Sequence, residues 1–137
     1  MRFMIIVKAT HDSEAGVMPE DSLFAAMASY HEELAKAGVL LDAAGLQPSS
    51  KGWRIRYGGS QRKLIDGPFA ETRELVAGYT LIQVRSRDEA REWARRFPAP
   101  MGDGVDAEIE VRQLYEIEDF APGASANRFR ELEAARR

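Results

Sequence analysis

A short loop between residues 66 and 74 gathers residue types that acid–base chemistry uses. Asp66 precedes a Gly-Pro step, and an aromatic ring and a carboxylate follow at Phe69 and Glu71. Proline fixes its own φ and keeps the preceding residue out of the helical region, so this corner of the chain is stiff. Functional side chains are often carried on rigid loops of this kind. Asp66 is therefore a candidate carboxylate base. Glu71 is a candidate ligand contact, with a solvated side chain as the alternative.

His31 is the second group that could move a proton. It lies four residues after Met27 and three before Leu34, on the apolar stripe of a helix expected over residues 19–37. Because imidazole has a reference pKa of about 6.5, His31 is a candidate general base, with Asp66 as the carboxylate that orients it. The alternative for His31 is a hydrogen-bonded core or interface histidine. The alternative for Asp66 is a turn cap that bonds backbone N–H groups.

Three aromatic residues are candidates for the walls of a ligand cleft: Phe69, Tyr79 and Trp53. Aromatic side chains in strands and corners also belong to the core, and Trp53 has the further alternative of packing across a dimer. The hairpin expected around Trp53 carries a basic face, formed by Arg54, Arg56, Arg62 and Lys63. That face suits an anion or an acidic partner, or else solvation and the protection of a strand edge.

Composition excludes several classes of site. The formal net charge of -3 argues against general nucleic-acid affinity, which needs a basic surface. The absence of cysteine excludes disulfides and thiolate metal sites, and two histidines with no zinc spacing make a zinc site an unfavourable interpretation. The spacing His11-Asp12-x-Glu14 is too loose to define a site, and residues 103–108 lack the calcium-loop pattern. Phosphate loops, dinucleotide fingerprints and nucleophile elbows are absent as well, so we expect no metal and no cofactor.

The first residues read as a strand rather than a targeting segment. One positive charge and a short apolar run end at Lys8, which is too short for a signal peptide or a membrane span. We therefore expect a cytoplasmic protein without a membrane partner. The length of 137 residues fits one domain, which we place at residues 1–120. Residues 121–137 form a tail that is either a short helix or frayed.

The elements that must position these residues follow from periodicity. Strands are expected over residues 2–9, 52–57, 61–65, 76–84 and 107–115, and another begins at Val39 and ends at Gly45 or Pro48. A second helix begins after the capping-box pattern Ser86-x-x-Glu89 and ends at Pro98. The order β-α-β, hairpin, β-α-β predicts an α+β fold, a ferredoxin-like split βαβ plait with an inserted β-hairpin.

The two helices can cover only one face of that sheet. The strand over residues 2–9 is nevertheless apolar on both faces, and a large apolar face is rarely left in water. A second copy of the same sheet would cover it. We therefore expect a homodimer packed through its sheet faces, a dimeric α+β barrel with two-fold symmetry.

The segment from Leu64 to Glu74, followed by Ala77-Gly78-Tyr79, resembles the DGPF-type branch of the YCII-related proteins. The similarity spans nearly all of residues 2–120 in one register and is carried further by residues 32–41, 44–52, 98–102 and 109–114. The resemblance implies a dimeric α+β barrel. It implies little about activity, because members are mostly of unknown function. Related YCII proteins are proposed to be enzymes with a His–Asp pair in a cleft, and some members occur beside or fused to extracytoplasmic-function sigma factors.

One position departs from the pattern of that branch. Many relatives have Asn before the Glu-Glu-Leu sequence, where this chain has His31. The resemblance therefore does not require an imidazole base at this position.

Two classes of function follow. The first is a small-molecule-binding protein or a metal-independent acid–base enzyme, with a cleft between helix and sheet and with His31, Asp66 and Glu71 near its mouth. The second is a non-catalytic regulatory or protein-interaction module that presents the hairpin, or Phe129 and Leu132 of the tail, to a sigma-factor-related partner. The clustered carboxylates and aromatic residues favour the first class, whereas only family context supports the named partner of the second.

Overall fold

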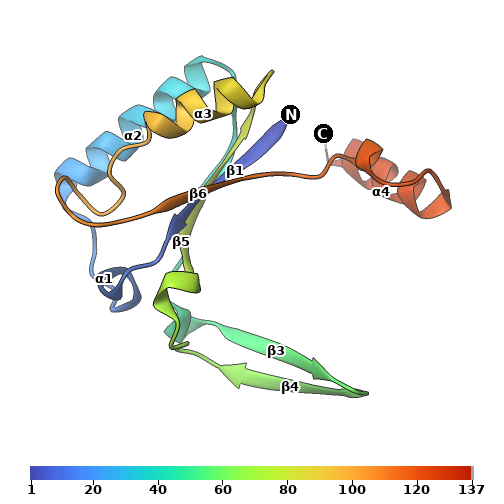
Figure 1. The fold of residues 1–137 in the computed structure, drawn as a ribbon, viewed down its shortest axis with the longest axis horizontal. Coiled ribbons are helices and arrows are strands. Elements are labelled where there is room, and N and C mark those ends of the chain that lie inside the picture. Colours follow the sequence, from blue (N-terminus) through green and yellow to red (C-terminus); the bar gives the residue numbers. More distant parts are fainter. Residues whose placement is uncertain (137) are drawn as a thin grey trace.

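The structure is a computed structural model that describes residues 1–136. Its main element is a four-stranded antiparallel sheet (Figure 1). Its strands lie in the order β2, β5, β1, β6, with bounds Leu40–Gly45, Val76–Gln83, Arg2–Lys8 and Ile109–Gln113. All four strands were expected from the sequence, and β6 is shorter than the predicted 107–115. The sheet is open, with β2 and β6 at its edges, so a single chain is an α+β fold and not a closed barrel.

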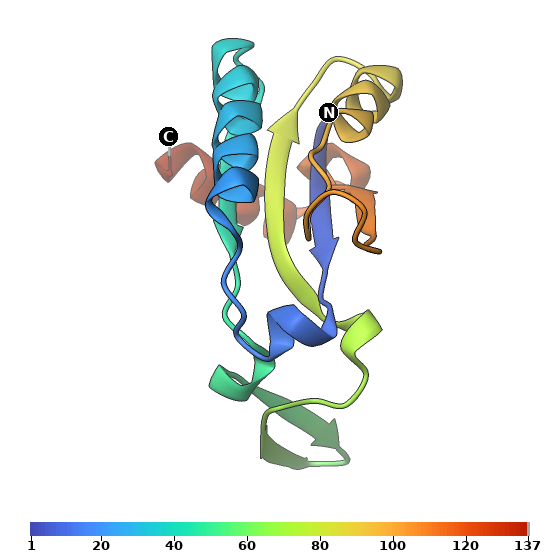
Figure 2. The same ribbon diagram turned by 90° about the vertical axis from the view of Figure 1, so that its left-hand side faces the viewer.

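Helices α2 (Asp21–Lys36) and α3 (Arg87–Arg95) cover one face of this sheet (Figures 1 and 2). The three side chains with the least exposure are Ile5 on β1, Ile82 on β5 and Leu34 on α2, and they meet in one core. The side chain of Ser86 accepts a hydrogen bond from the Glu89 N–H at the start of α3, so the predicted N-cap is present. The alternating burial of β1 follows from the two-residue period of a strand.

The opposite face of the sheet is only half covered within one chain. Met4 and Ile6 of β1 and Tyr79 and Leu81 of β5 alternate with the core residues and keep intermediate exposure. The expected burial of β1 on both faces is therefore not reached by one chain alone. Burial is complete only on the side that α2 and α3 cover.

A separate two-stranded sheet projects from the end of the four-stranded sheet (Figures 1 and 2). It is the predicted hairpin, formed by β3 (Trp53–Gly58) and β4 (Gln61–Asp66). Gly58 pairs with Gln61, and the turn between them contains Gly59 with a positive φ of 58°. A left-handed φ in a two-residue hairpin turn favours glycine, which explains the sequence at this point.

One short helix was not expected from the sequence. Residues 10–16, in which no helix or strand was predicted, contain the one-turn helix α1 (His11–Glu14). The side chains of Thr10 and Ser13 each accept a hydrogen bond from the other residue's backbone N–H, which supplies the cap that starts this turn. The tail forms helix α4 (Ala124–Ala135), one of the two predicted alternatives.

Helix α4 lies on the side of the sheet away from α2 and α3 and stands off from it (Figure 1). A salt bridge of 2.9 Å from Arg2 to Glu116 and a longer contact of 3.8 Å from Arg2 to Glu133 connect this region to β1. Phe129 and Leu132 of α4 remain 60% and 61% exposed. Across residues 1–136, no helix has both the length and the apolar character that a bilayer span requires.

Candidate functional site

The first half of the 66–74 loop packs against backbone. The Gly67 N–H donates to the Gly52 carbonyl at 3.0 Å, and the Gly67–Pro68 peptide bond is cis. A Cβ atom at Gly67 would lie 1.8 Å from the carbonyl oxygen of Ser49. Only glycine fits this approach, so the Gly of the motif has a structural cause.

Ser49 joins the loop to two other segments. It begins the 3₁₀ turn η1 (Ser49–Lys51), and its hydroxyl accepts a hydrogen bond from the Phe69 N–H at 3.1 Å. The same hydroxyl donates to one carboxylate oxygen of Glu14, and the Ser49 N–H donates to the other at 2.9 Å. Helix α1, turn η1 and the 66–74 loop are therefore held together through one serine.

The aromatic ring of the motif is also used in packing. The guanidinium of Arg54 on β3 lies 3.8 Å from the centroid of the Phe69 ring, a cation–π contact that ties the hairpin to the loop. Trp53, the neighbouring candidate, is 63% exposed. The Tyr79 hydroxyl lies on the half-covered face of the sheet, where it donates to Asp42 Oδ2 at 2.9 Å. This hydrogen bond to a carboxylate raises the pKa of Tyr79.

His31 sits between α2 and β5 with both ring nitrogens engaged. Nδ1 lies 2.7 Å from the Met27 carbonyl, and Nε2 lies 2.8 Å from Oγ1 of the buried Thr80. A carbonyl oxygen can only accept, so Nδ1 carries the proton, and in the neutral ring Nε2 accepts from the Thr80 hydroxyl. The rings of Tyr30 and Phe97 pack edge-on against the imidazole. This environment matches a hydrogen-bonded histidine at the boundary of the core.

Asp66 and Glu71 have a different environment from His31. Both residues are exposed, Asp66 at the end of β4 and Glu71 before the 3₁₀ turn η2 (Thr72–Glu74). Within residues 1–136, no hydrogen bond joins His31 to Asp66, and neither carboxylate caps a backbone N–H group.

A cavity of about 470 Å³ lies just beyond the loop, where η2 meets the end of β1. We call it the His11 cavity. Its walls are Lys8, Ala9, Thr10, His11, Thr72, Arg73, Asp106, Ala107 and Glu108. One imidazole, two cations and two carboxylates therefore share one cavity wall.

Backbone hydrogen bonds position the three segments that form the His11 cavity. The Lys8 N–H donates to the Glu108 carbonyl at 3.0 Å, and the Ala9 N–H donates to the Leu75 carbonyl at 3.0 Å. Thr10 caps α1, so His11 is the first residue of that helical turn. The Lys8 ammonium lies 3.9 Å from the carboxylate of Glu110 on β6.

Comparison with known proteins identifies the family. A family model for the YCII-related domain matches residues 1–116 of this chain. The chain belongs to the YCII-related family. An uncharacterised protein from Rhizobium meliloti (strain 1021) is 35% identical to it over 69 residues. That alignment covers 50% of this chain and 56% of the relative, so the match reaches only about half of each protein.

In this YCII-related chain, the residues that line the His11 cavity are not the candidates named from the sequence. None of the six candidate residues lines the His11 cavity: His31, Asp66, Phe69, Glu71, Tyr79 and Trp53. Thr72 and Arg73 belong to the 66–74 loop, whereas the other residues that line the cavity carried weak sequence signals, namely the loose His11-Asp12-x-Glu14 spacing and the acidic segment 103–108. In the part of the chain that the structure describes, no three His, Asp or Glu side chains are grouped so that they could hold a metal ion.

Proposed function

We propose that this YCII-related protein binds a small anionic molecule in the His11 cavity and acts there as a metal-independent acid–base enzyme. The observation that carries the proposal is the wall of that cavity, in which an imidazole, two cations and two carboxylates converge. Its volume of about 470 Å³ lies in the range of small-molecule sites, roughly 300–1,000 Å³.

The residue types that line the cavity suit two chemical roles, proton transfer and the binding of an anionic group. His11 supplies an imidazole, the side chain that most often serves as a general acid or base. The guanidinium of Arg73 and the ammonium of Lys8 supply the charge that would hold an anionic substrate group. Proton transfer of this kind serves an isomerisation, a lyase step or a hydrolysis. Arg73 belongs to the 66–74 loop, and the hydrogen bond of that loop to Ser49 would help to fix its position.

An acid–base role for His31 with Asp66 is a separate proposal with a structural cost. It requires one imidazole nitrogen to give up its partner, either the Met27 carbonyl or the Thr80 hydroxyl. Ligand contacts at Phe69, Glu71, Tyr79 and Trp53 likewise stay proposals, in keeping with the resemblance to the DGPF-type branch.

The test is to map ligand-induced amide shifts by two-dimensional ¹H–¹⁵N NMR with a panel of aliphatic and aromatic carboxylates. We expect shifts at residues 8–11, 72–73 and 106–108. Arg73→Gln should weaken the best binder about tenfold, since a charge-assisted contact contributes roughly 1.5–3 kcal/mol. His31→Asn should leave the affinity unchanged. Shifts that cluster at His31 and Asp66 instead would overturn the assignment of the site.

We also propose that two chains pack through the half-covered sheet face to form a dimeric α+β barrel. One chain exposes 10291 Å² for a mass of 15.3 kDa. A compact monomer of that mass exposes about 7,100 Å², so the chain has roughly 3,000 Å² of additional surface. Obligate dimers bury roughly 1,000–2,500 Å² per partner, which such an excess can supply.

Sedimentation velocity tests the dimer directly. Leu81 lies on the half-covered face, and Leu81→Arg should convert the dimer to monomer because an arginine there would be buried without a partner. Phe24→Arg is a suitable control, since Phe24 is 64% exposed and lies on α2. A wild-type protein that stays monomeric at micromolar concentration would exclude the barrel.

The alternative function is a non-catalytic regulatory or protein-interaction module. It is favoured by the two projecting segments, because Trp53 and Tyr57 on the hairpin are 63% and 67% exposed and α4 presents Phe129 and Leu132. A sigma-factor-related protein is the partner that family context suggests. Co-purification of such a partner that is lost on removing residues 122–137, together with no carboxylate binding, would favour this alternative.

A further inference from the structure

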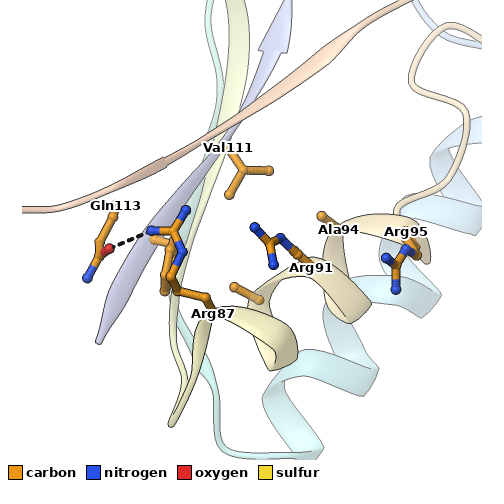
Figure 3. Close-up of a pocket in the computed structure, with 8 residues that line it drawn as sticks. Arg87, Arg91, Ala94, Arg95, Val111 and Gln113 are labelled. Atoms are coloured by element: carbon orange, nitrogen blue, oxygen red, sulfur yellow. Dashed lines mark hydrogen bonds between the residues drawn. The ribbon is translucent and has the colours of Figure 1, made fainter.

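A second cavity, of about 260 Å³, lies between α3 and the strands β1 and β6 (Figure 3). We call it the arginine cavity. Its walls are Phe3, Arg87, Ala90, Arg91, Ala94, Arg95, Val111 and Gln113. It shares no residue with the His11 cavity, and no wall residue is acidic.

Three arginines stand at four-residue intervals along α3: Arg87, Arg91 and Arg95. Residues four apart lie on the same helix face, and like charges at that spacing destabilise a helix. Arg91 and Arg95 have acidic neighbours, Asp88 and Glu92, each at 3.3 Å. These pairs are exposed and contribute little to stability, so a bound anion would compete readily for both guanidinium groups.

Arg87 is already oriented for a ligand. Its Nη1 donates to Gln113 Oε1 at 2.9 Å, and its guanidinium lies 5.9 Å from the centroid of the Phe3 ring. Figure 3 shows Arg87 and Arg91 extending from α3 into the space in front of Val111, with Arg95 farther along the helix. The remaining N–H groups of Arg87 can still donate, because a guanidinium has five.

The floor of the arginine cavity is apolar. Phe3 and Ala90 are buried at 4% and 2% exposure, and Val111 is half-buried. An occupant therefore meets two kinds of surface, guanidinium groups on one side and an apolar floor on the other.

We propose that the arginine cavity binds a small organic phosphate. The phosphate would lie against Arg87 and Arg91, and its apolar substituent would rest on Phe3, Ala90 and Val111. A carboxylate has two oxygens and one charge, which one guanidinium fork satisfies. A phosphate monoester has three terminal oxygens and about two charges, which two guanidinium groups one helical turn apart can share.

The site would stay open in the proposed dimer. The cavity lies on the sheet face that carries α2 and α3, whereas the dimer would use the opposite face. Its occupancy is therefore independent of the His11 cavity and of the sheet-to-sheet contact, and its test is independent of theirs.

Isothermal titration calorimetry with phenyl phosphate at physiological ionic strength tests the proposal, with amide shifts to locate the ligand. We expect phenyl phosphate to bind more tightly than both inorganic phosphate and benzoate. Arg91→Gln should weaken phenyl phosphate at least tenfold. Arg91→Lys should weaken it less, because lysine keeps the charge and loses the fork.

The matched control is Arg62→Gln, which changes the net charge equally but lies on β4 of the hairpin. It should leave the affinity unchanged. Equal weakening by Arg62→Gln and Arg91→Gln would show non-specific attraction and overturn the proposal. The absence of binding to the wild-type chain at millimolar phenyl phosphate would overturn it too, and thermal unfolding of each variant establishes that it is folded.

Discussion

The first half of the 66–74 loop (residues 66–69) and the His11 cavity, which Thr72 and Arg73 of the same loop help to line, differ in what their residues do. In the loop, Gly67 and the Phe69 N–H are tied to Ser49, and the Phe69 ring is covered by Arg54. In the cavity, the exposed residues His11 and Arg73 are among the lining residues. The first half of the loop therefore has a structural role. The residues that line the cavity come from the end of β1, from α1, from residues 106–108 and, at Thr72 and Arg73, from the second half of the same loop.

The largest effect that would test this contrast is expected at Gly67. A methyl group in Gly67→Ala would meet the Ser49 carbonyl oxygen, so the backbone must shift, and we expect a loss of about 3 kcal/mol in the free energy of unfolding. Urea denaturation measures it. Gly58→Ala is the control, because nothing lies within 4 Å of a Cβ there, and its effect should stay below about 1 kcal/mol. Equal effects at the two glycines would contradict a structural role for Gly67.

Ser49 should give the next effect. Ser49→Ala removes the acceptor of the Phe69 N–H and a donor to Glu14, and groups left without partners cost about 1–3 kcal/mol. The exposed neighbour Ser50 provides the control substitution Ser50→Ala, for which we expect a change within about 0.5 kcal/mol. If chemical denaturation does not separate the two variants, Ser49 does not join these segments.

Alanine variants of the two histidines test the boundary of the core, at His31, against the cavity, at His11. His31→Ala breaks the contacts to Met27 and Thr80 and leaves a buried hydroxyl, so we expect a loss of about 2 kcal/mol in stability. His11→Ala should change stability by less than about 0.5 kcal/mol, because His11 is exposed. The affinity for the carboxylate ligand should fall in His11→Ala and stay unchanged in His31→Ala. A large stability loss at His11 would indicate that this histidine is structural as well.

The last effect is a pH dependence from Tyr30, which packs beside His31 and whose titration has no influence on stability near neutral pH. Burial raises the pKa of Tyr30 to about 12, from 10.0 in the unfolded chain. Because the folded state holds this proton more tightly, its contribution to stability is complete below pH 10 and is lost as the pH rises toward 12. Phenolate absorbance followed against pH in wild type and Tyr30→Phe isolates this group from the other tyrosines. A Tyr30 transition near pH 10 would mean that the ring is hydrated.

Much of the fold could be predicted because it depends on local patterns. The alternation of β1, the glycine turn at Gly59 and the cap at Ser86 each act within a few residues. Helix α1 was missed because its start depends on a reciprocal pair, Thr10 and Ser13, inside a polar segment with no apolar stripe. The close approach at Gly67 could not be predicted, since the glycine alone does not show which backbone it meets.

The sequence by itself determined the α+β element order, the hairpin, the stiff Gly-Pro corner and the similarity to YCII-related proteins. Only the tertiary structure decided which charged groups share a cavity. Because β5 and β6 run antiparallel to β1, the end of β1 lies beside the starts of both strands. Lys8, Arg73 and Glu108 therefore meet at one end of the sheet, although up to a hundred residues separate them in the chain. Hydrogen bonding between strands enforces that convergence, and no local pattern in the sequence records it.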